Sequence, residues 1–478
     1  MKKYIFISLV FLGSLQQQLS AQNQTDALRY SQVYFSGTAR SIAMGGSFGA
    51  LGGDFSSLSI NPAGIGIYKN TEITFSPSNY YKIVKSNYNN NPTIDRKSNF
   101  NLSNAGIVFV IKPKKETAAC KGIQLGIGFN RVNNYNYNAY FEGSNSQNSI
   151  INDYVNSAQG TNPGDLDEFS NTLAFNTYLI DTLGSLTNYV GAVPRGGTLQ
   201  SKIINVSGSN NELVLALGGN WNDKLYIGGT VGFPTVRYIE NTTYKESDVA
   251  DTINRFKNMT VNNYLETHGT GFNFKIGLIY RITDWVRVGV ALHTPTFYSL
   301  KDYWNSDMEA QFDNGDKYNA KSPDGRFDYQ LSTPFKANGS VGFIIGKYAL
   351  ITGEYEFVDY RNAHLNSSTD RFVKENRAIE NQLSYQSNVR AGVEVKIKNF
   401  SIRGGYTFNT SPYATHLNID NRQAISGGLG VKVDKFFVDA AYSYIMTKDK
   451  YYLYPSVPTA VTNSMVAHNA VLTFGMKF

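Results

Sequence analysis

Alternation of apolar and polar positions is the clearest pattern along this chain. In the final stretch, Ala470, Leu472, Phe474, Met476 and Phe478 alternate with polar or small residues. Because side chains along a strand point to opposite faces in turn, these five share one face. That face suits lipid, and the other suits a wet lumen. A single edge strand of a soluble sandwich would show the same pattern, so the interpretation depends on its repetition.

The alternation recurs, and charged residues keep to one face. In residues 389–397, valines and Ile397 alternate with Arg390, Glu394 and Lys396. Similar segments occur at 272–281, 402–408, 438–444 and 470–478. Arg or Lys on a lipid face near the bilayer midplane costs about 2–4 kcal/mol, so the charges must point inward. The opposite faces carry Phe, Ile, Val and Tyr, where a soluble β protein would need polar residues.

Connections between these segments are very short at one end and long at the other. Tight joins occur at Asn222-Asp223, Thr283-Asp284, Gly346-Lys347, Lys398-Asn399 and Asp434-Lys435. Long connections are expected near residues 85–98, 141–198, 240–262, 305–325, 361–381, 410–421 and 447–467. Outer-membrane barrels combine short periplasmic turns with long outer loops. The sequence therefore predicts an all-β fold, a transmembrane antiparallel β-barrel of about 14 strands over residues 71–478.

The N-terminus predicts export. A basic start at Met1 to Lys3, an apolar stretch from Tyr4 to Leu15 and the small-residue site at Ala21 indicate a cleaved signal over residues 1–21. No cysteine follows closely, which argues against a lipid-anchored lipoprotein, and Cys120 has no second cysteine to pair with. Outside the signal, no window holds the roughly 18 apolar residues of a spanning helix.

Composition agrees with a barrel. The 478 residues include 43 Gly, 33 Tyr and 29 Phe, and the mean hydropathy is only −0.30. A polar lumen and polar loops dilute the lipid face in such proteins. The formal charge of +7 is modest and scattered, so we expect no nucleic-acid partner.

Residues 22–70 are expected to form a plug inside the lumen. The stretch 36–67 is rich in Gly, Ala and Ser and lacks sustained alternation. Asp54 can cap a short helical turn, which Asn61-Pro62-Ala63 would end because the residue before proline avoids helical dihedrals. A 14-strand lumen is wider than side chains fill, so plug or water must occupy it. Apolar residues of this plug that could contact a ligand are Met44, Phe48, Leu51 and Phe55.

Two further expectations concern the lumen and the longest loop. Glu354, Glu356, Arg390 and Arg403 are expected to dock the plug by ion pairing, with binding of a ligand head group as the alternative. Within residues 141–198, apolar residues recur at helical spacing, among them Leu166, Phe169 and Leu173. The helix either packs on neighbouring loops or forms a surface groove that first captures an apolar solute.

Three separated regions resemble the FadL/TodX family of outer-membrane transporters for hydrophobic compounds. Asn61-Pro62-Ala63 resembles the signature of the family's N-terminal hatch, Thr410-Ser411-Pro412 resembles a Ser-Pro in the matching loop, and residues 468–478 resemble its last strand. The resemblance covers essentially the whole mature chain. It implies a monomer of 14 strands with a hatch, an apolar pocket, and sideways release into the membrane beside a kinked third strand. Here that strand is Ile123 to Tyr140, with an irregular stretch at 131–136.

Enzyme chemistry finds little support. Residues 45–49, Gly-Gly-Ser-Phe-Gly, match a nucleophile-elbow pattern but lack the strand and helix that the elbow requires. The five histidines, at positions 268, 293, 364, 416 and 468, show no metal-ligand spacing. We expect no enzyme activity, no cofactor and no metal.

The leading hypothesis is a passive outer-membrane channel for long-chain fatty acids or other hydrophobic solutes, because no segment resembles an energy-transducer box. Expected partners are a fatty acid-like molecule, outer-membrane lipid, and the barrel-assembly machinery through the strand ending at Phe478. One alternative is a PorV-like secretion or assembly factor on the same barrel. Another is a barrel-embedded lipid hydrolase, with His293 as its base.

Overall fold

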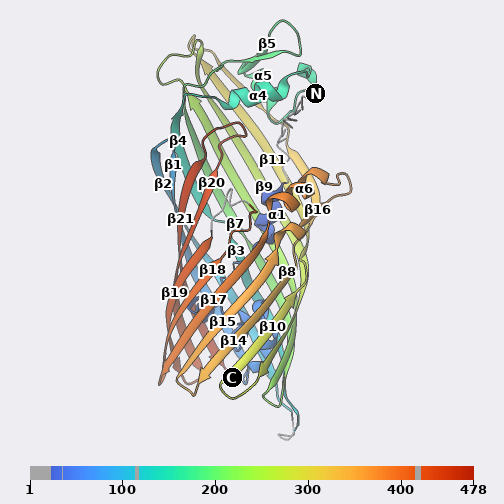
Figure 1. The fold of residues 1–478 in the computed structure, drawn as a ribbon, viewed down its shortest axis with the longest axis vertical. Helices are drawn as coiled ribbons and strands as arrows, with labels where there is room; N and C mark the ends of the chain where they lie inside the picture. The colour runs from blue at the N-terminus through green and yellow to red at the C-terminus, as the bar shows by residue number, and fades with distance from the viewer. Residues whose placement is uncertain (1–22, 35, 114–117, 415–420) are drawn as a thin grey trace, which may run out of the picture.

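The structure is a computed structural model that describes residues 23–34, 36–113, 118–414 and 421–478. The predicted signal, residues 1–21, lies outside the described residues. Every wall strand pairs antiparallel with its neighbours, and the first strand pairs with the last, which closes the sheet into a barrel (Figure 1). The prediction of a 14-strand antiparallel barrel is confirmed.

The wall strands mostly follow the chain order, and three of them are interrupted. They are β1 (Glu72–Tyr88), β2 (Asn91–Ile111), β3 (Cys120–Asn134) continued by β4 (Tyr137–Asn145), β7 (Thr198–Trp221), β8 (Leu225–Ser247), β9 (Phe256–Arg281), β10 (Val286–His293) continued by β11 (Phe297–Phe312), β13 (Gly325–Ser332) continued by β14 (Lys336–Ile345), β15 (Ala349–Asp359), β17 (Tyr385–Ile397), β18 (Phe400–Asn409), β19 (Arg422–Val433), β20 (Phe436–Tyr451) and β21 (Val461–Lys477). Prolines at 295 and 334 mark two of the interruptions, because proline cannot donate to a strand ladder.

The remaining elements lie before the wall or in its connections. The N-terminal segment, residues 23–68, holds α1 (Gln24–Ser31), α2 (Ala39–Ala43), α3 (Ser57–Ile60) and the 3-10 helix η1 (Pro62–Ile67). The connections hold α4 (Ile150–Ala158), η2 (Pro163–Asp165), α5 (Asn171–Asn176), β5 (Ile180–Thr182), β6 (Tyr189–Gly191), β12 (Lys317–Lys321), η3 (Tyr360–Asn362), β16 (His364–Asn366) and α6 (Val373–Gln382). Among the described residues, no helix is long and apolar enough to cross a membrane.

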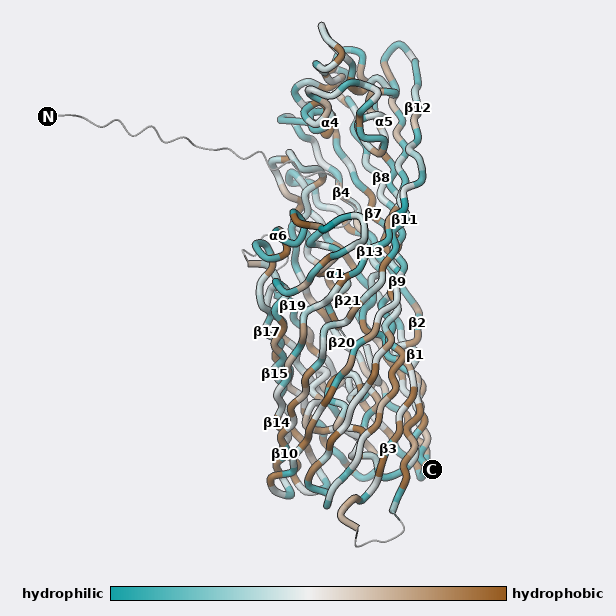
Figure 2. Tube along the Cα trace, turned by 90° about the vertical axis from the view of Figure 1, so that its right-hand side faces the viewer, coloured by the Kyte–Doolittle hydropathy of each residue, from teal (hydrophilic) through white to brown (hydrophobic). Residues whose placement is uncertain are grey.

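The predicted facing of side chains is confirmed. Phe272, Phe274 and Ile276 are exposed on the outer face, whereas Asn273 and Lys275 between them are buried inside. Hydrophobic residues are concentrated in the lower part of the barrel, at the end of the short turns, and the upper part is mostly polar (Figure 2). The lower band is therefore the part that suits the bilayer.

Several long connections predicted from the sequence are instead strand. Residues 85–98 form the ends of β1 and β2 and a tight turn at Asn89 and Asn90, both with positive φ. Parts of 240–262, 305–325 and 447–467 also extend the wall. Outside the membrane the outer face of a strand no longer meets lipid, so the apolar outward positions disappear from the sequence although the backbone ladder continues.

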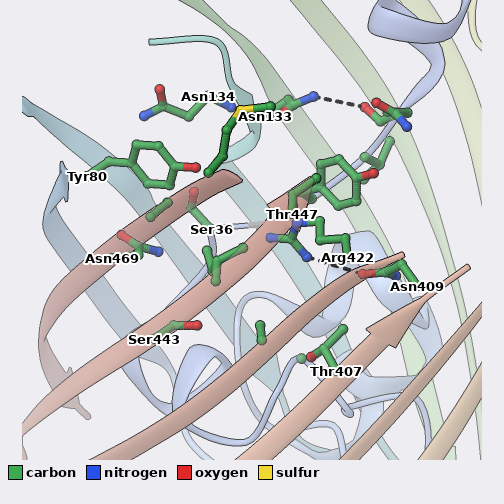
Figure 3. A pocket seen from close by; sticks show the side chains of 18 of the residues that line it. Ser36, Tyr80, Asn133, Asn134, Thr407, Asn409, Arg422, Ser443, Thr447 and Asn469 are labelled. Carbon is green, nitrogen blue, oxygen red and sulfur yellow. Dashed lines mark hydrogen bonds between the residues drawn. The ribbon is translucent and has the colours of Figure 1, made fainter. Parts of the chain in front are cut away.

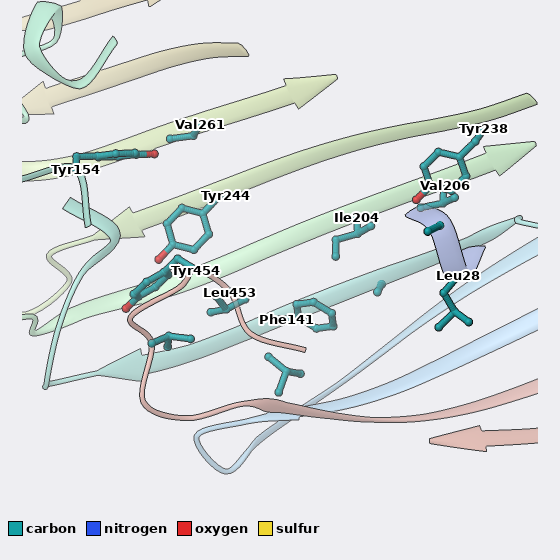
Figure 4. Close-up of a cluster of buried hydrophobic side chains, with 14 of the residues drawn as sticks. Leu28, Phe141, Tyr154, Ile204, Val206, Tyr238, Tyr244, Val261, Leu453 and Tyr454 are labelled. Carbon is teal, nitrogen blue, oxygen red and sulfur yellow. The ribbon is translucent and has the colours of Figure 1, made fainter. Parts of the chain in front are cut away.

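The upper part of the barrel has its own hydrophobic core (Figure 4). Phe141, Tyr244 and Val206 from the wall pack there with Tyr454 of the β20–β21 connection. Glu246, fully buried, accepts hydrogen bonds from Ile150 N at 2.8 Å and Thr198 Oγ1 at 2.9 Å, which joins α4 to the wall. The long connection between β4 and β7, which holds α4 and α5, is therefore packed on the top of the barrel rather than extended as a free loop.

Candidate functional site

Pairs of wall glycines receive the N-terminal segment. Gly106 and Gly128 face each other on β2 and β3, and a Cβ on either would lie within 2.5 Å of the Phe55 ring. Gly228 and Gly277 face each other on β8 and β9, beside Asn61 and Pro62. A third pair, Gly392 and Gly405, lies against Met44. Close approach of two backbones requires residues without a Cβ, so the wall is shaped for this segment.

Asn61 joins the N-terminal segment to itself and to the wall. Its side-chain oxygen accepts from Ala63 N at 3.1 Å, and its amide donates to Gly49 O at 2.6 Å. The preceding carbonyl, on Ile60, lies 2.9 Å from both His293 Nε2 and Asn338 Nδ2. Asn61 and Pro62 end α3 as the sequence predicted, and Asn61 also caps the 3-10 helix that follows.

Gly277→Ala is expected to displace Asn61. The new Cβ would lie 1.8 Å from the Asn61 side-chain oxygen, so the side chain or the strand must move. We expect the midpoint of thermal unfolding to fall, measured by heat-modified gel mobility of the protein in detergent. Gly339→Ala is the matched control, because a Cβ there meets nothing within 4 Å. Equal midpoints for the two variants would contradict this packing.

A buried ion network ties the N-terminal segment to the barrel wall. Arg40 contacts Glu394 through two hydrogen bonds of 2.8 and 3.2 Å, and Arg403 Nε donates to the same carboxylate at 2.6 Å. Arg403 also pairs with Asp439 at 2.6 Å. Glu354 accepts from Gly49 N at 2.8 Å. Among the described residues, the ion pair between the N-terminal segment and the wall is Arg40–Glu394, which the sequence interpretation missed.

The other charges expected to dock the plug have different partners. Arg390 pairs with Glu354 at 2.6 Å and with Glu356 at 3.1 Å, and all three belong to the wall. Glu356 also accepts from Asn388 at 2.7 Å. Of these four, Glu354 contacts the N-terminal segment directly, through Gly49 N. Arg390 is linked to the segment through Glu354, and Arg403 is linked to it through Glu394, which also binds Arg40.

A cavity of about 370 Å³ lies between the N-terminal segment and the wall (Figure 3). This volume is within the usual range of small-molecule sites. Apolar or small side chains cover much of it, including Leu28, Ile42, Ile60, Ala424, Ile445, Met465 and Ala467. Wall polar groups complete it, including Tyr80, Asn133, Thr407, Asn409, Ser443 and Asn469. Four of these six polar residues lie on β18, β20 and β21. The sequence predicted inward faces on these strands but did not identify a site there.

Cations outnumber carboxylates around this cavity. Arg29 pairs with Asp26. Arg390 pairs with Glu354 and Glu356. Arg422 instead donates to Asn409 Oδ1 at 3.2 Å and lies 4.3 Å from the centre of the Tyr34 ring. It forms no ion pair within 4.0 Å with a carboxylate of the described residues. The cavity thus contains an arginine that has no carboxylate partner among the described residues.

The predicted site residues lie near the cavity rather than along it. Met44, Phe48, Leu51 and Phe55 are all buried, and the cavity is lined by their neighbours Ile42, Gly45, Gly46 and Ile60. In the long connection, Leu166 and Leu173 are buried in the upper core, and Phe169 packs on Trp304 with ring centres 5.6 Å apart. Of the three, only Leu173 lies in a helix, α5, whereas Leu166 and Phe169 precede it, so the predicted helix is shorter than the sequence spacing indicated. These side chains pack on their neighbours, and a capture groove there stays a prediction.

The backbone ladder of the wall is interrupted beside the cavity. β2 pairs with β3 only from Asn104 to Ile111, and β4 pairs with β7 alone, so residues 91–103 of β2 face residues 131–145 without backbone hydrogen bonds. We call this boundary the seam. The register of β3 shifts between Arg131 and Asn133, which confirms the irregular stretch predicted in the third strand.

Side chains bridge the seam at both ends. Above, Asn89 and Asn91 donate to the carbonyls of Ser144 and Glu142 at 2.8 and 3.0 Å, and Thr93 donates to Tyr140 O. Below, Arg131 Nε donates to Leu102 O at 3.1 Å and Asn134 to Asn99 at 3.2 Å. Each bridge is one side-chain hydrogen bond, which separates more readily than a continuous ladder.

Catalytic arrangements are not assembled among the described residues. His293 contacts the Ile60 carbonyl, and Ser47 contacts Thr352 Oγ1 at 3.2 Å, in a turn after α2 rather than between strand and helix. Within the described ranges, no group of three or more His, Cys, Asp or Glu is placed to hold a metal. His416 lies outside the described residues.

Solved structures of outer-membrane channels share this fold. The toluene transporter TodX of Pseudomonas putida matches with a TM-score of 0.54 and 11% identity, covering 94% of this chain and 100% of that one. A FadL homologue of Pseudomonas aeruginosa matches with a TM-score of 0.57 and 11% identity, covering 94% and 99%. The Ralstonia pickettii toluene transporter TbuX matches with a TM-score of 0.50 and 14% identity, covering 92% of this chain and 98% of that one. No curated protein sequence matches the chain.

The family assignment comes from the sequence itself. The model for outer membrane protein transport proteins (OMPP1/FadL/TodX) matches residues 195–476, which is more than half of the chain. The matched region runs from the start of β7 almost to the end of β21 and includes most of the wall. This chain belongs to the OMPP1/FadL/TodX family of outer-membrane transport proteins.

Proposed function

We propose that this outer-membrane protein is a passive channel for hydrophobic solutes and that its substrates are long-chain carboxylic acids. The observation that carries the proposal is the cavity, which combines apolar walls with Arg422, a cation free of ion pairs to described carboxylates. A neutral hydrocarbon needs only the apolar wall. An amphiphilic acid uses both, because a guanidinium binds a carboxylate through two parallel hydrogen bonds.

The strength of such binding is compatible with transport. Each methylene removed from water contributes about 0.8 kcal/mol, so ten of them contribute roughly 8 kcal/mol before the costs of immobilising the chain. This retains the solute yet allows release down a concentration gradient. No coupled energy source is then required.

The N-terminal segment and the seam complete the proposed route. Residues 22–70 act as the plug, because their contacts with strands on several sides of the barrel would hold them in the lumen. The solute enters the cavity from outside and leaves through the seam into the membrane, where only side-chain bridges must open. The protein works as a monomer, since one chain supplies cavity, plug and seam.

Arg422→Met is expected to weaken palmitate binding about tenfold, the order of one lost charge-assisted hydrogen-bond pair. Binding of radiolabelled palmitate and of toluene to the detergent-purified protein measures this. Toluene binding should be unchanged, because it uses no head-group contact. Arg195→Met, an exposed arginine of the long connection, is the control. Unchanged palmitate binding, or equal losses for both ligands, would count against carboxylates as substrates.

A secretion or assembly factor on the same barrel stays the alternative prediction. Such a protein would bind a protein partner rather than a solute. It should co-purify with that partner in stoichiometric amounts and should bind no palmitate. Palmitate binding that depends on Arg422 would favour the channel.

A further inference from the structure

Two lysines lie directly opposite each other where the wall ladder is interrupted. Lys82 on β1 and Lys97 on β2 are register partners in the antiparallel pairing. Residues directly opposite in such a pair have Cβ atoms about 4.5–5.5 Å apart on one face, and like charges there destabilise the sheet. Two ammonium groups at this position therefore have a cost that a further interaction must offset.

Both ammonium groups reach across the seam to the same place. Lys97 Nζ donates to Val206 O at 2.7 Å, and Lys82 Nζ lies 4.6 Å from the centre of the Tyr137 ring. Tyr137 and Val206 are themselves register partners on β4 and β7. Between the bridges at Thr93 and Asn99, these two lysines contact residues on the far side of the seam.

Neither lysine forms an ion pair within 4.0 Å with a carboxylate of the described residues. Asp449 attracts Lys82 and Asp95 attracts Lys97 without forming an ion pair, and each also accepts a hydrogen bond: Asp449 from Asn463 at 2.7 Å, and Asp95 from Arg96 N at 2.6 Å. Each ammonium has three N–H donors, and one carbonyl and one ring use few of them. The pair can therefore bind an anion with two oxygens.

We propose that Lys82 and Lys97 form a carboxylate-binding station at the seam, where the head group of an amphiphilic acid binds as its chain passes from the cavity to the bilayer. The inference rests on the proposed function and adds a second head-group site to it. Lys82 lines the cavity, and Lys97 places a second ammonium group at the seam beside it. An acid bound first at Arg422 would thus find a second cationic site on the way out.

The test compares a charged and a neutral solute of equal length. Lys82→Met, Lys97→Met and the double variant remove the charge and keep most of the side-chain length. Each is reconstituted into phosphatidylcholine vesicles, and the initial uptake of radiolabelled palmitate and of hexadecanol is measured. Lys85→Met is the matched control, because Lys85 lies on the same strand with an exposed side chain. The variant carrying both Lys82→Arg and Lys97→Arg tests rescue by charge.

In the double methionine variant the initial uptake of palmitate is expected to fall about tenfold, because one charge-assisted contact is lost. The uptake of hexadecanol should not change. The double arginine variant should recover most of the palmitate uptake. If the wild type takes up palmitate above the protein-free rate, equal uptake by the double methionine variant would overturn the station, and so would equal loss of both solutes.

Palmitate binding to the same variants in detergent separates this inference from the proposed function. If the wild type moves neither solute but binding still falls in the double methionine variant, the channel proposal fails and the station stands. If binding is the same in the double variant and the wild type, the station fails whatever the uptake shows.

Discussion

Deletion of residues 36–67 is expected to convert a barrel with little ionic conductance into an open pore. These residues hold α2, α3 and η1, which fill the paired glycine recesses of the wall. The lumen of a 14-strand barrel is wider than its own side chains fill. Removing residues 36–67 should therefore leave a water-filled channel. Planar-bilayer recordings of wild type and deletion variant in the same salt measure the difference.

The barrel of the deletion variant should still form, because the wall ladder from β1 to β21 does not include the deleted residues. Heat-modified gel mobility confirms folding before the recording. If the deletion variant does not fold, Gly277→Ala offers a milder displacement and should conduct more than the wild type. A folded deletion variant as silent as the wild type would show that these residues do not block the lumen.

Glu394→Ala is expected to cause the largest loss of stability for a single substitution. The Glu394 side chain is fully buried and accepts hydrogen bonds from both Arg40 and Arg403. Removing one partner of a buried ion pair leaves uncompensated charge and typically costs about 3–5 kcal/mol. Urea unfolding of the protein in lipid vesicles, followed by tryptophan fluorescence, measures the change.

Two comparisons show whether the loss comes from the ion network. Glu309→Ala removes an exposed glutamate of β11 and should change the unfolding free energy by less than about 0.5 kcal/mol. The double variant Arg40→Met with Glu394→Ala should be less destabilised than the two single losses added together, because they share one interaction. Strict additivity would mean that Arg40 and Glu394 do not stabilise each other.

The sequence predicts the wall well, because lipid imposes a simple rule on it. Alternation through 389–397 and 470–478 identified the outward faces, and the tight joins at Lys398 and Asp434 fixed the strand ends, where both residues have positive φ. Above the membrane this rule disappears. The ends of β1 and β2 therefore resemble loop in sequence although their backbone pairing continues.

The cavity was much harder to predict, since its residues come together only through closure of the barrel. Arg422 on β19, Lys82 on β1 and Tyr34 of the N-terminal segment are distant in sequence. A small inward side chain such as Ala424 has no pattern that separates it from other lumen positions. One signal was available: the wall glycines opposite each other, such as Gly228 and Gly277, indicate where another backbone approaches closely.

The account makes one central claim, that hydrophobic acids cross the outer membrane through the cavity of this barrel. Ser443 lines the cavity (Figure 3), so Ser443→Cys in a Cys120→Ser background places one thiol there, and a bulky thiol reagent can fill the cavity after the protein has folded. The measurement is palmitate uptake into vesicles before and after labelling. We expect uptake well above that of protein-free vesicles before labelling and its loss afterwards. Uptake that equals the protein-free rate, or that survives complete labelling, would contradict the claim.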